Sequence, residues 1–295
     1  MFEDLVARQA GVVSLAQASA YGYTPDRVRR RVREGRWRRL YPGVVLVGGH
    51  QLTDEARVRA AWLWASRRQQ GRGPLTDGGV AVGGPAAAFW HGMQPCAPQV
   101  VDVSTPTGSR ARSRPGVRVC RRVLPAVDVA PVRGVHVTGR ALTALETAIV
   151  LPNGSAFLDR ALQKHVSFAD VYGAYCRSLG RRGSADMYRL LVIAADRADS
   201  AAERVVVKLL RTAGISGWVL GLPFGPYKID LAFPDVKVAI EIDGWAWHVD
   251  QDRFVGDRRK QNALVRAGWT VLRFTWHDLT RTPGAVVAQI AAALA

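Results

Sequence analysis

The sequence has few cysteines, and their spacing does not suit cross-linking or zinc binding. Three of the 295 residues are cysteine, namely Cys96, Cys120 and Cys176, and no two of them form a CxxC pair. This spacing argues against a disulfide framework and against a cysteine-rich zinc site. We expect the three side chains to be small buried groups.

The chain also lacks a long hydrophobic run. Its apolar stretches are far shorter than the roughly 20 residues that cross a bilayer. The first ten residues, MFEDLVARQA, carry acids where a secretory leader would carry positive charge. We therefore expect a cytoplasmic protein without membrane contact. The hydrophobic content of 48% is ordinary for a globular protein, and the length allows two or three domains.

Acidic residues are scarce relative to basic ones. The 24 Asp and Glu residues stand against 41 Lys and Arg, which gives a net charge of +17. The excess is +5 in residues 1–50, +9 in 51–202 and +3 in 203–295, so no single region carries it. A positive field favours polyanionic partners, because phosphate contacts release counterions. Arginine-rich codon usage in a GC-rich genome is the alternative explanation.

Residues 1–50 have the pattern of a winged helix-turn-helix domain. Three short helices are predicted over residues 2–9, 15–21 and 25–34, each followed by a glycine. Thr24 and Pro25 are a good cap and first-turn residue for the third helix. The following run, RWRRLYPGVVLV, fits a two-stranded wing with a turn at Pro42-Gly43.

The arginines of this region are the candidate DNA-binding residues. The third helix would lie in a major groove, with the wing against backbone phosphates. A solvated, arginine-coated helical cap is the alternative. The run VVSLAQASAYGYTPDRVRRRVREGRWRRLYPGV resembles the winged helix of the abortive-infection type E antitoxin family. The candidates are Arg29, Arg30, Arg33, Arg36, Arg38 and Arg39.

Residues 51–199 are predicted to form a mixed α/β connecting domain without a catalytic constellation. Strands are expected over residues 99–104 and 117–123, on either side of the loop PTGSRARSRPG. Arg110, Arg112 and Arg114 of this loop are candidates for phosphate contact, although an exposed charged loop is the default interpretation. Several helices are expected afterwards, the last of them over residues 184–197.

Residues 200–295 are predicted to form a small α/β sandwich. A helix is expected over residues 200–214, with Ser200 and Glu203 at capping-box spacing. Strands over residues 218–222, 227–233 and 236–242 come next, then a helix over 254–267 and a strand over 271–275. A last alanine-rich helix begins at Asp278 or Thr282. Two antiparallel strands, a crossover helix and a third strand would give a sheet with helices on both faces.

The two central strands of this region carry acids at positions that share a face. Because strand side chains alternate, Asp230 lies opposite to Ile229 and Leu231, while Glu241 and Asp243 share a face of the next strand. If the hairpin turns tightly at Pro234-Asp235, Asp230 lies across from Ala239 and diagonal to Glu241. Two carboxylates on a common face would be costly to bury without a cation.

A divalent metal would relieve that cost and supply chemistry. Mg²⁺, or Mn²⁺, takes carboxylate oxygens and can ionise a bound water for attack on phosphorus. Asp243 would be an outer ligand that steers this water, and His248 would accept its proton. Five residues of the crossover helix could reach the phosphate or orient the carboxylates, namely Asp257, Arg258, Arg259, Lys260 and Gln261.

Each of these residues also has an ordinary structural explanation. Asp230 could cap a turn, Glu241 could pair with an arginine, Asp243-Gly244 is a good turn dipeptide, and His248 could be a surface residue. Their joint occurrence before GWTVLRFTW favours the metal site. Glu203 is adequately explained by the capping box.

The segment IDLAFPDVKVAIEIDGWAWH…DRRKQNALVRAGWTVLRFTW resembles a domain family related to the very-short-patch mismatch-repair endonuclease, in the restriction-endonuclease-like PD-(D/E)xK group. This resemblance implies Asp230 and Glu241 as metal-binding acids, Glu203 as an additional helix acid, and His248 as a catalytic histidine. Asp243 stands where the group has a lysine, and zinc-binding cysteines are missing. Lys260 or Arg259 would replace the missing lysine.

We therefore expect an α+β multidomain protein with a winged helix-turn-helix domain (1–50), a mixed α/β middle region (51–199) and a restriction-endonuclease-like α/β sandwich (200–295). The leading function is a Mg²⁺-dependent DNA endonuclease. The alternative is a non-catalytic DNA-binding regulator or antitoxin, for which the resemblance implies a nucleotidyltransferase-type toxin partner. A homodimer is a further expected assembly, and an RNA-processing nuclease would use the same site.

Overall fold

The computed structural model describes residues 1–67, 79–243 and 251–295 of the chain. These residues form two compact units, Met1–Ser178 and Leu179–Ala295, each with its own helices and sheets. The mixed α/β composition agrees with the expectation from the sequence. No helix in these ranges is long and apolar enough to span a bilayer.

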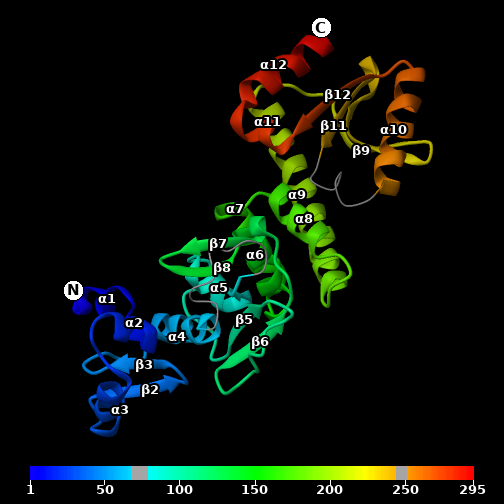
Figure 1. Ribbon diagram of the computed structural model, residues 1–295. Coiled ribbons are helices and arrows are strands. Elements are labelled where there is room, and N and C mark those ends of the chain that lie inside the picture. Colours follow the sequence, from blue (N-terminus) through cyan, green and yellow to red (C-terminus); the bar gives the residue numbers. More distant parts are fainter. Residues whose placement is uncertain (68–78, 244–250) are drawn as a thin grey trace. The chain divides into compact units, whose positions relative to one another are not determined.

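The N-terminal part of the first unit contains three helices and a three-stranded sheet (Figure 1). The predicted helices and hairpin are confirmed, and the short strand β1 was not predicted. Thr24 accepts a hydrogen bond from the N–H of Arg27, and Gly22 and Gly35 follow their helices with φ of +79° and +71°. The elements are α1 (Phe2–Arg8), β1 (Val12–Ser14), α2 (Leu15–Ala20), α3 (Pro25–Arg33), β2 (Trp37–Tyr41) and β3 (Val44–Val47).

Both faces of this small sheet are buried. Trp37 and Val45 pack against Phe2 and Val28 of the three helices. The opposite face packs on helix α4 (Asp54–Ser66), and its residues belong to one hydrophobic core with the middle region of the chain. Residues 1–50 therefore have one small core of their own and share the core on the opposite sheet face with the rest of the first unit. The side chains shared in this way include Val12, Val44 and Leu46.

The middle region is built around a five-stranded sheet with the strand order β6-β5-β4-β8-β7. The predicted strands β5 (Val101–Thr105) and β6 (Val117–Arg121) are present, and three further strands were not anticipated: β4 (Ala81–Gly83), β7 (Val129–Val132) and β8 (Val135–Thr138). The three cysteines are exposed, so the expectation that they are buried is wrong. The helices that accompany the sheet are α5 (Gly84–Trp90), α6 (Arg140–Ala148), α7 (Gly154–Lys164) and α8 (Phe168–Arg177), with a short 3₁₀ turn, η1 (Ala126–Asp128).

The second unit begins with one long helix, α9 (Ser184–Thr212). Two helices were predicted here, with a new start at Ser200, and this expectation is wrong. The segment from Ser184 to Thr212 contains neither glycine nor proline, so nothing in it interrupts the backbone hydrogen bonds. Ser200 lies inside the helix, and a capping box therefore does not explain Glu203.

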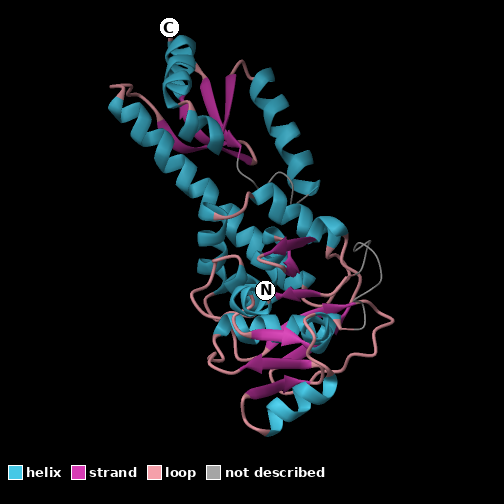
Figure 2. Ribbon diagram, turned by 60° about the vertical axis from the view of Figure 1, so that its left-hand side comes forward, coloured by secondary structure: helices cyan, strands magenta, loops and turns pink. Residues whose placement is uncertain are grey.

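The rest of the second unit is a four-stranded sheet, ordered β12-β11-β10-β9, between two layers of helices (Figure 2). Helix α10 connects the parallel strands β11 and β12 as a crossover. Figure 1 shows α10 on one side of these strands and α11 and α12 on the other. The elements are β9 (Val219–Phe224), β10 (Tyr227–Phe233), η2 (Pro234–Val236), β11 (Val238–Asp243), α10 (Gln251–Arg266), β12 (Thr270–Thr275), α11 (Trp276–Arg281) and α12 (Pro283–Leu294).

The hairpin between β10 and β11 has a longer turn than predicted. Phe233 pairs with Val238, so four residues form the turn, and Lys237 has a φ of +49° at its end. Ala232, and not Asp230, lies across from Ala239. The predicted register was wrong by two residues. Because side chains alternate with a period of two, a shift of two residues moves no side chain to the other face.

Candidate active site

The alternation of side chains along β10 is interrupted next to Asp230. Ile229 packs on the α10 side of the sheet, whereas Leu231 packs on the α9 side, so the expectation that they share a face is wrong. Gly221 of β9, which lies between the partners of these two residues, has a φ of +62°, a conformation that favours glycine. Beyond the last ladder pair of β10 and β11, Asp230 Oδ2 accepts a hydrogen bond from the N–H of Ile242 at 2.9 Å. The carboxylate therefore points toward β11.

Glu241 is buried on the face of β11 that α10 covers. Its side chain alternates with Ile240 and Ile242, which pack on the α9 side, and it follows Ala239, which packs with Leu264 of α10. The residue is 7% exposed. One carboxylate oxygen, Oε1, is buried and has no hydrogen-bond partner among the described residues. A buried acceptor without a partner is costly, and such groups are often completed by an ion or a water.

Lys260 of α10 joins the two acids. Its side chain, 12% exposed, is ion-paired with Glu241 Oε2, and its Nζ lies 4.0 Å from Asp230 Oδ1. Lys260 precedes Leu264 by four residues, so both lie on the helix face that packs on the sheet. Three charged groups from β10, β11 and α10 therefore converge in a largely buried space.

The charge state of Glu241 is set by competing effects. Burial raises the pKa of this carboxyl to about 7, and the nearby Asp230 carboxylate raises it as well. The hydrogen bond and the charge of Lys260, and then the charge of Arg273, oppose the rise. Glu241 thus exchanges its proton near neutral pH, as is common for groups in functional sites.

The residues present fit a hard divalent cation. Two carboxylates supply oxygen ligands, and one buried oxygen has no partner. No third carboxylate, imidazole or thiol completes a cluster with them in the part of the chain that the structure describes. Mg²⁺ accepts such a small ligand set, because it keeps several of its waters. The ion would carry +2 and would compete with the Lys260 ammonium for the same acids.

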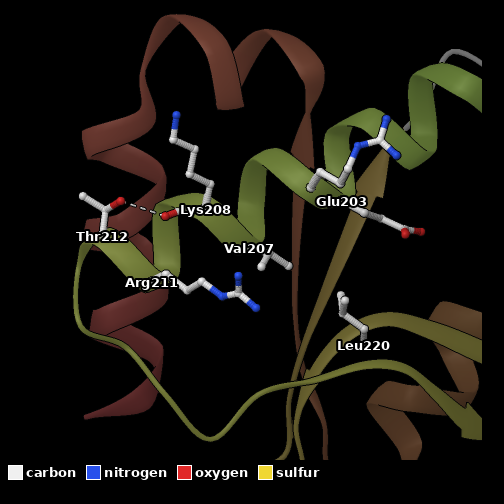
Figure 3. Close-up of a pocket in the computed structure, with 7 residues that line it drawn as sticks. Glu203, Val207, Lys208, Arg211, Thr212 and Leu220 are labelled. Atoms are coloured by element: carbon white, nitrogen blue, oxygen red, sulfur yellow. Dashed lines mark hydrogen bonds between the residues drawn. The ribbon is translucent and has the colours of Figure 1, made fainter.

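Glu203 lies on the other side of the sheet. Helix α9 packs through Ala202 and Val206 against the face that carries Ile240, opposite to Glu241. Figure 3 shows Glu203 and Leu220 among the residues around a pocket of about 410 Å³ between α9 and β9. The structure does not bring Glu203 together with Asp230 and Glu241, so its role as an additional metal ligand remains a prediction.

The remaining candidates of this region are only partly within the described residues. Asp243 ends β11, beside Thr275 of β12, as a backbone position. His248 lies outside the described residues. Arg258 and Arg259 are exposed on α10, unlike Lys260, which reaches the acids. Of the two residues expected to replace the missing lysine, Lys260 is thus the one that contacts Glu241.

One polar residue near the acids, Arg273, was missed, whereas Gln261 was among the expected residues of the crossover helix. Arg273 of β12 is the parallel register partner of Glu241, and its Nη1 donates to Oε1 of Gln261 at 3.5 Å. Gln261 follows Lys260 on α10. Because register partners on adjacent strands present their side chains on the same face, Arg273 adds positive charge beside Glu241. The sequence GWTVLRFTW contained the signal, since it places one arginine within an otherwise apolar strand.

The six candidate DNA-binding arginines of the winged helix are all exposed, and they fall into two groups. Arg29 is ion-paired with Asp26, and Glu34 lies 3.9 Å from Arg30 Nε and 3.3 Å from Arg36 Nε. The second group has neither an ion pair nor a hydrogen bond to its side chains within residues 1–67, 79–243 and 251–295, so its charges are available to a ligand. It consists of Arg33, Arg38 and Arg39.

Three family models match separate stretches of the chain. A model described as the AbiEi antitoxin, a transcriptional regulator, matches residues 3–48. One for the AbiEi antitoxin C-terminal domain matches residues 80–190. A restriction-endonuclease-like model, REase_MTES_1575, matches residues 203–294, which include Asp230, Glu241 and Lys260. The resemblance to antitoxin and restriction-endonuclease-like families expected from the sequence is confirmed.

Two curated proteins of Mycobacterium tuberculosis are similar to the chain over much of its length. They are uncharacterized protein MT2308 of strain CDC 1551 / Oshkosh and uncharacterized protein Rv2248 of strain H37Rv. Each is 30% identical over 192 residues, which is 62% of this chain and 70% of the mycobacterial protein. Their descriptions name no activity.

Proposed function

We propose that this chain, which belongs to the family of the two mycobacterial proteins and joins AbiEi antitoxin regions to a restriction-endonuclease-like region, is a divalent-metal-dependent DNA endonuclease targeted by its winged helix. One observation carries the proposal. Asp230, Glu241 and Lys260 come from three elements and meet in a largely buried space, within the restriction-endonuclease-like region.

Asp230 and Glu241 would hold Mg²⁺ or Mn²⁺. When bound, such an ion polarises a phosphate oxygen and lowers the pKa of a coordinated water, which is the chemistry that phosphodiester hydrolysis needs. The hydrogen bond from Ile242 to Asp230 fixes one carboxylate for this task. The buried, unpartnered Oε1 of Glu241 supplies a ligand atom that is already free of competing protein contacts among the described residues.

Lys260 would stabilise negative charge on the phosphate. The Lys260 ammonium lies close to both acids in the absence of substrate. A phosphate bound to an ion at these acids would therefore be next to this ammonium. Preorganised positive charge at such a position lowers the barrier, because it needs no reorganisation during the reaction. Asp243 as a ligand that steers water, His248 as the base, and Arg258 and Arg259 as phosphate contacts remain part of the proposal.

The winged helix would supply binding to duplex DNA. Arg33, Arg38 and Arg39 are exposed and unpaired within the described ranges, so DNA phosphates would not have to displace an internal partner. Arg29, Arg30 and Arg36 would contribute as well, after exchanging a surface ion pair for a phosphate. Such surface pairs are worth about 0–1 kcal/mol, so the exchange costs little.

A second function is favoured by the matches over residues 3–48 and 80–190. A chain with both AbiEi antitoxin regions would act as a non-catalytic DNA-binding regulator, with a toxin as its partner or a second copy of the chain. The restriction-endonuclease-like region would then contribute binding without cleavage. Both functions share duplex DNA as ligand, so they are separated by cleavage and not by binding.

The test is plasmid nicking by the purified chain in Mg²⁺ or Mn²⁺, compared with the double variant Asp230→Ala, Glu241→Ala. The endonuclease requires nicking by the parent, none by the double variant, and unchanged DNA affinity in both. Asp235→Ala is the matched control, because Asp235 is an exposed acid in the turn of the same hairpin. Equal binding without cutting by any of the three proteins would establish the regulator instead. Competition between duplex DNA and RNA tests the substrate.

A further inference from the structure

The loop between β5 and β6, residues 106–116, is a fixed, positively charged segment of the middle region. It carries Arg110, Arg112 and Arg114 and contains no acidic residue. Arg110 and Arg112 are exposed, and no hydrogen bond or ion pair engages their side chains among the residues that the structure describes. We call this segment the basic loop.

The backbone of the basic loop is held by the adjacent strand. Arg121 donates from Nε to the carbonyl of Ser109 at 3.1 Å and from Nη2 to that of Ala111 at 2.8 Å. Ser113 Oγ accepts a hydrogen bond from the N–H of Val119 at 3.0 Å. These contacts order the loop without using Arg110 or Arg112, so both side chains are presented on a defined backbone.

The basic loop also contacts the winged helix. Arg114 lies over the ring of Trp64 at 4.5 Å, and Tyr41 at the end of wing strand β2 packs against the same ring at 5.9 Å. A Cβ added at Gly116 would lie 3.0 Å from the Tyr41 hydroxyl, so the end of the loop touches this tyrosine. Arg67, whose guanidinium also lies over the Trp64 ring, donates to the carbonyl of Pro42 in the wing turn at 2.8 Å.

These contacts give the wing and the basic loop a fixed separation. Ala111 of the loop and Tyr41 of the wing pack on the same hydrophobic core, and both lie in the first compact unit. Arg39, which is exposed, precedes Tyr41 by two residues on β2, so the wing also carries positive charge close in sequence to this contact. A charged loop on a mobile linker would lose conformational entropy when it binds, whereas an ordered loop loses little.

We infer that the basic loop extends the DNA-contacting surface of the winged helix into the middle region, with Arg110 and Arg112 bound to backbone phosphates beyond those that the wing reaches. This inference rests on the proposed docking of the winged helix on duplex DNA. Phosphate contacts carry no sequence information, so the loop adds affinity and orientation and leaves base recognition to helix α3.

The experiment measures binding of the full-length chain to a fluorescein-labelled DNA duplex of about three helical turns, between about 50 and about 200 mM salt. The loop variant is Arg110→Ala, Arg112→Ala. Loss of two phosphate contacts lowers the slope of log affinity against log salt by about 1.8 and weakens binding on the order of tenfold. The variant Arg110→Lys, Arg112→Lys keeps the charges and retains most of the affinity.

The matched control is Arg140→Ala, Arg160→Ala, which removes the same charge from exposed positions on α6 and α7 of the same unit. A loop variant that binds like this control overturns the inference, because the loop then acts only through net charge. The variant Arg33→Ala, Arg38→Ala, Arg39→Ala tests the underlying proposal separately. Unchanged binding in that variant overturns winged-helix docking itself, and with it the role of the loop. Equal thermal midpoints establish that the variants fold.

Discussion

Lys260 on α10 donates a hydrogen bond to Glu241 on β11, and the same ammonium lies 4.0 Å from Asp230 on β10. One cation thus faces two acids, and the remaining oxygen of Glu241 has no partner within the described part of the chain. Two neighbouring acids, one of them with a buried acceptor that has no hydrogen-bond partner, are suited to an additional cation.

Asp230→Asn is expected to separate metal binding from folding. The asparagine oxygen can still accept the hydrogen bond from Ile242, so the free energy of unfolding should change by about 1 kcal/mol or less. Loss of the carboxylate charge should lower Mn²⁺ affinity and the nicking rate by about 100-fold or more. Calorimetric Mn²⁺ titration and plasmid nicking measure these effects. An unchanged Mn²⁺ affinity and an unchanged nicking rate in the variant would show that Asp230 is not part of the site.

Lys260→Met keeps the apolar stem of the side chain and removes its charge. Cleavage at saturating Mg²⁺ should fall by about 100-fold, whereas Lys260→Arg should retain part of the rate because it keeps a cation. Single-turnover cleavage is the measurement. Arg266→Met is the control, since Arg266 is exposed on the same helix and donates to the carbonyl of Asn262 within that helix. Equal rates for Lys260→Met and this control would exclude a catalytic ammonium.

The raised pKa of Glu241 predicts a pH dependence of stability in the metal-free protein. Its pKa is about 7 when folded and near 4.5 when unfolded, so the folded chain binds the proton more tightly. The resulting stabilisation is complete below about pH 4.5 and is lost as pH rises through 7, with an upper limit of about 3 kcal/mol.

Glu241→Gln removes this titration. In the presence of a chelator, the thermal midpoint of the parent should therefore fall relative to that of Glu241→Gln as the pH is raised from 5 to 8. A ¹³C carboxyl resonance that titrates near neutrality should be present in the parent and missing in the variant. A pH-independent difference, or a Glu241 resonance that titrates near 4.5, would show that the carboxyl is ionised throughout.

Residues 1–50 should be unstable when separated from the middle region. Cutting after residue 50 exposes the side chains of Val12, Val44 and Leu46, each at most 4% exposed in the chain. Burying three such side chains contributes about 5 kcal/mol, which is comparable to the whole stability of a small domain. A fragment of residues 1–178 should unfold cooperatively in urea, followed by tryptophan fluorescence, whereas a fragment of residues 1–50 should not. Matching midpoints for the two fragments would contradict this.

The sequence alone determined which residues could form a site, and it did so through local rules. Prolines and glycines at the ends of the predicted helices and in the wing turn located the winged helix. The alternation of side chains along β10 and β11 placed Asp230 and Glu241 on the same face of the sheet. The register error of two residues did not change this placement, because the side-chain period is also two. Their places on the predicted third helix and at the start of the predicted wing made six arginines of residues 1–50 candidates for DNA contact.

Only the tertiary structure decided which of these residues meet. Packing of Leu264 on the sheet orients α10, and that orientation selects Lys260 over Arg259. The hydrogen bond from Ile242 holds the Asp230 carboxylate toward β11, and the continuous helix α9 places Glu203 at the opposite face of the sheet. These outcomes depend on contacts between segments that are distant in sequence, and neither spacing nor composition encodes such contacts locally.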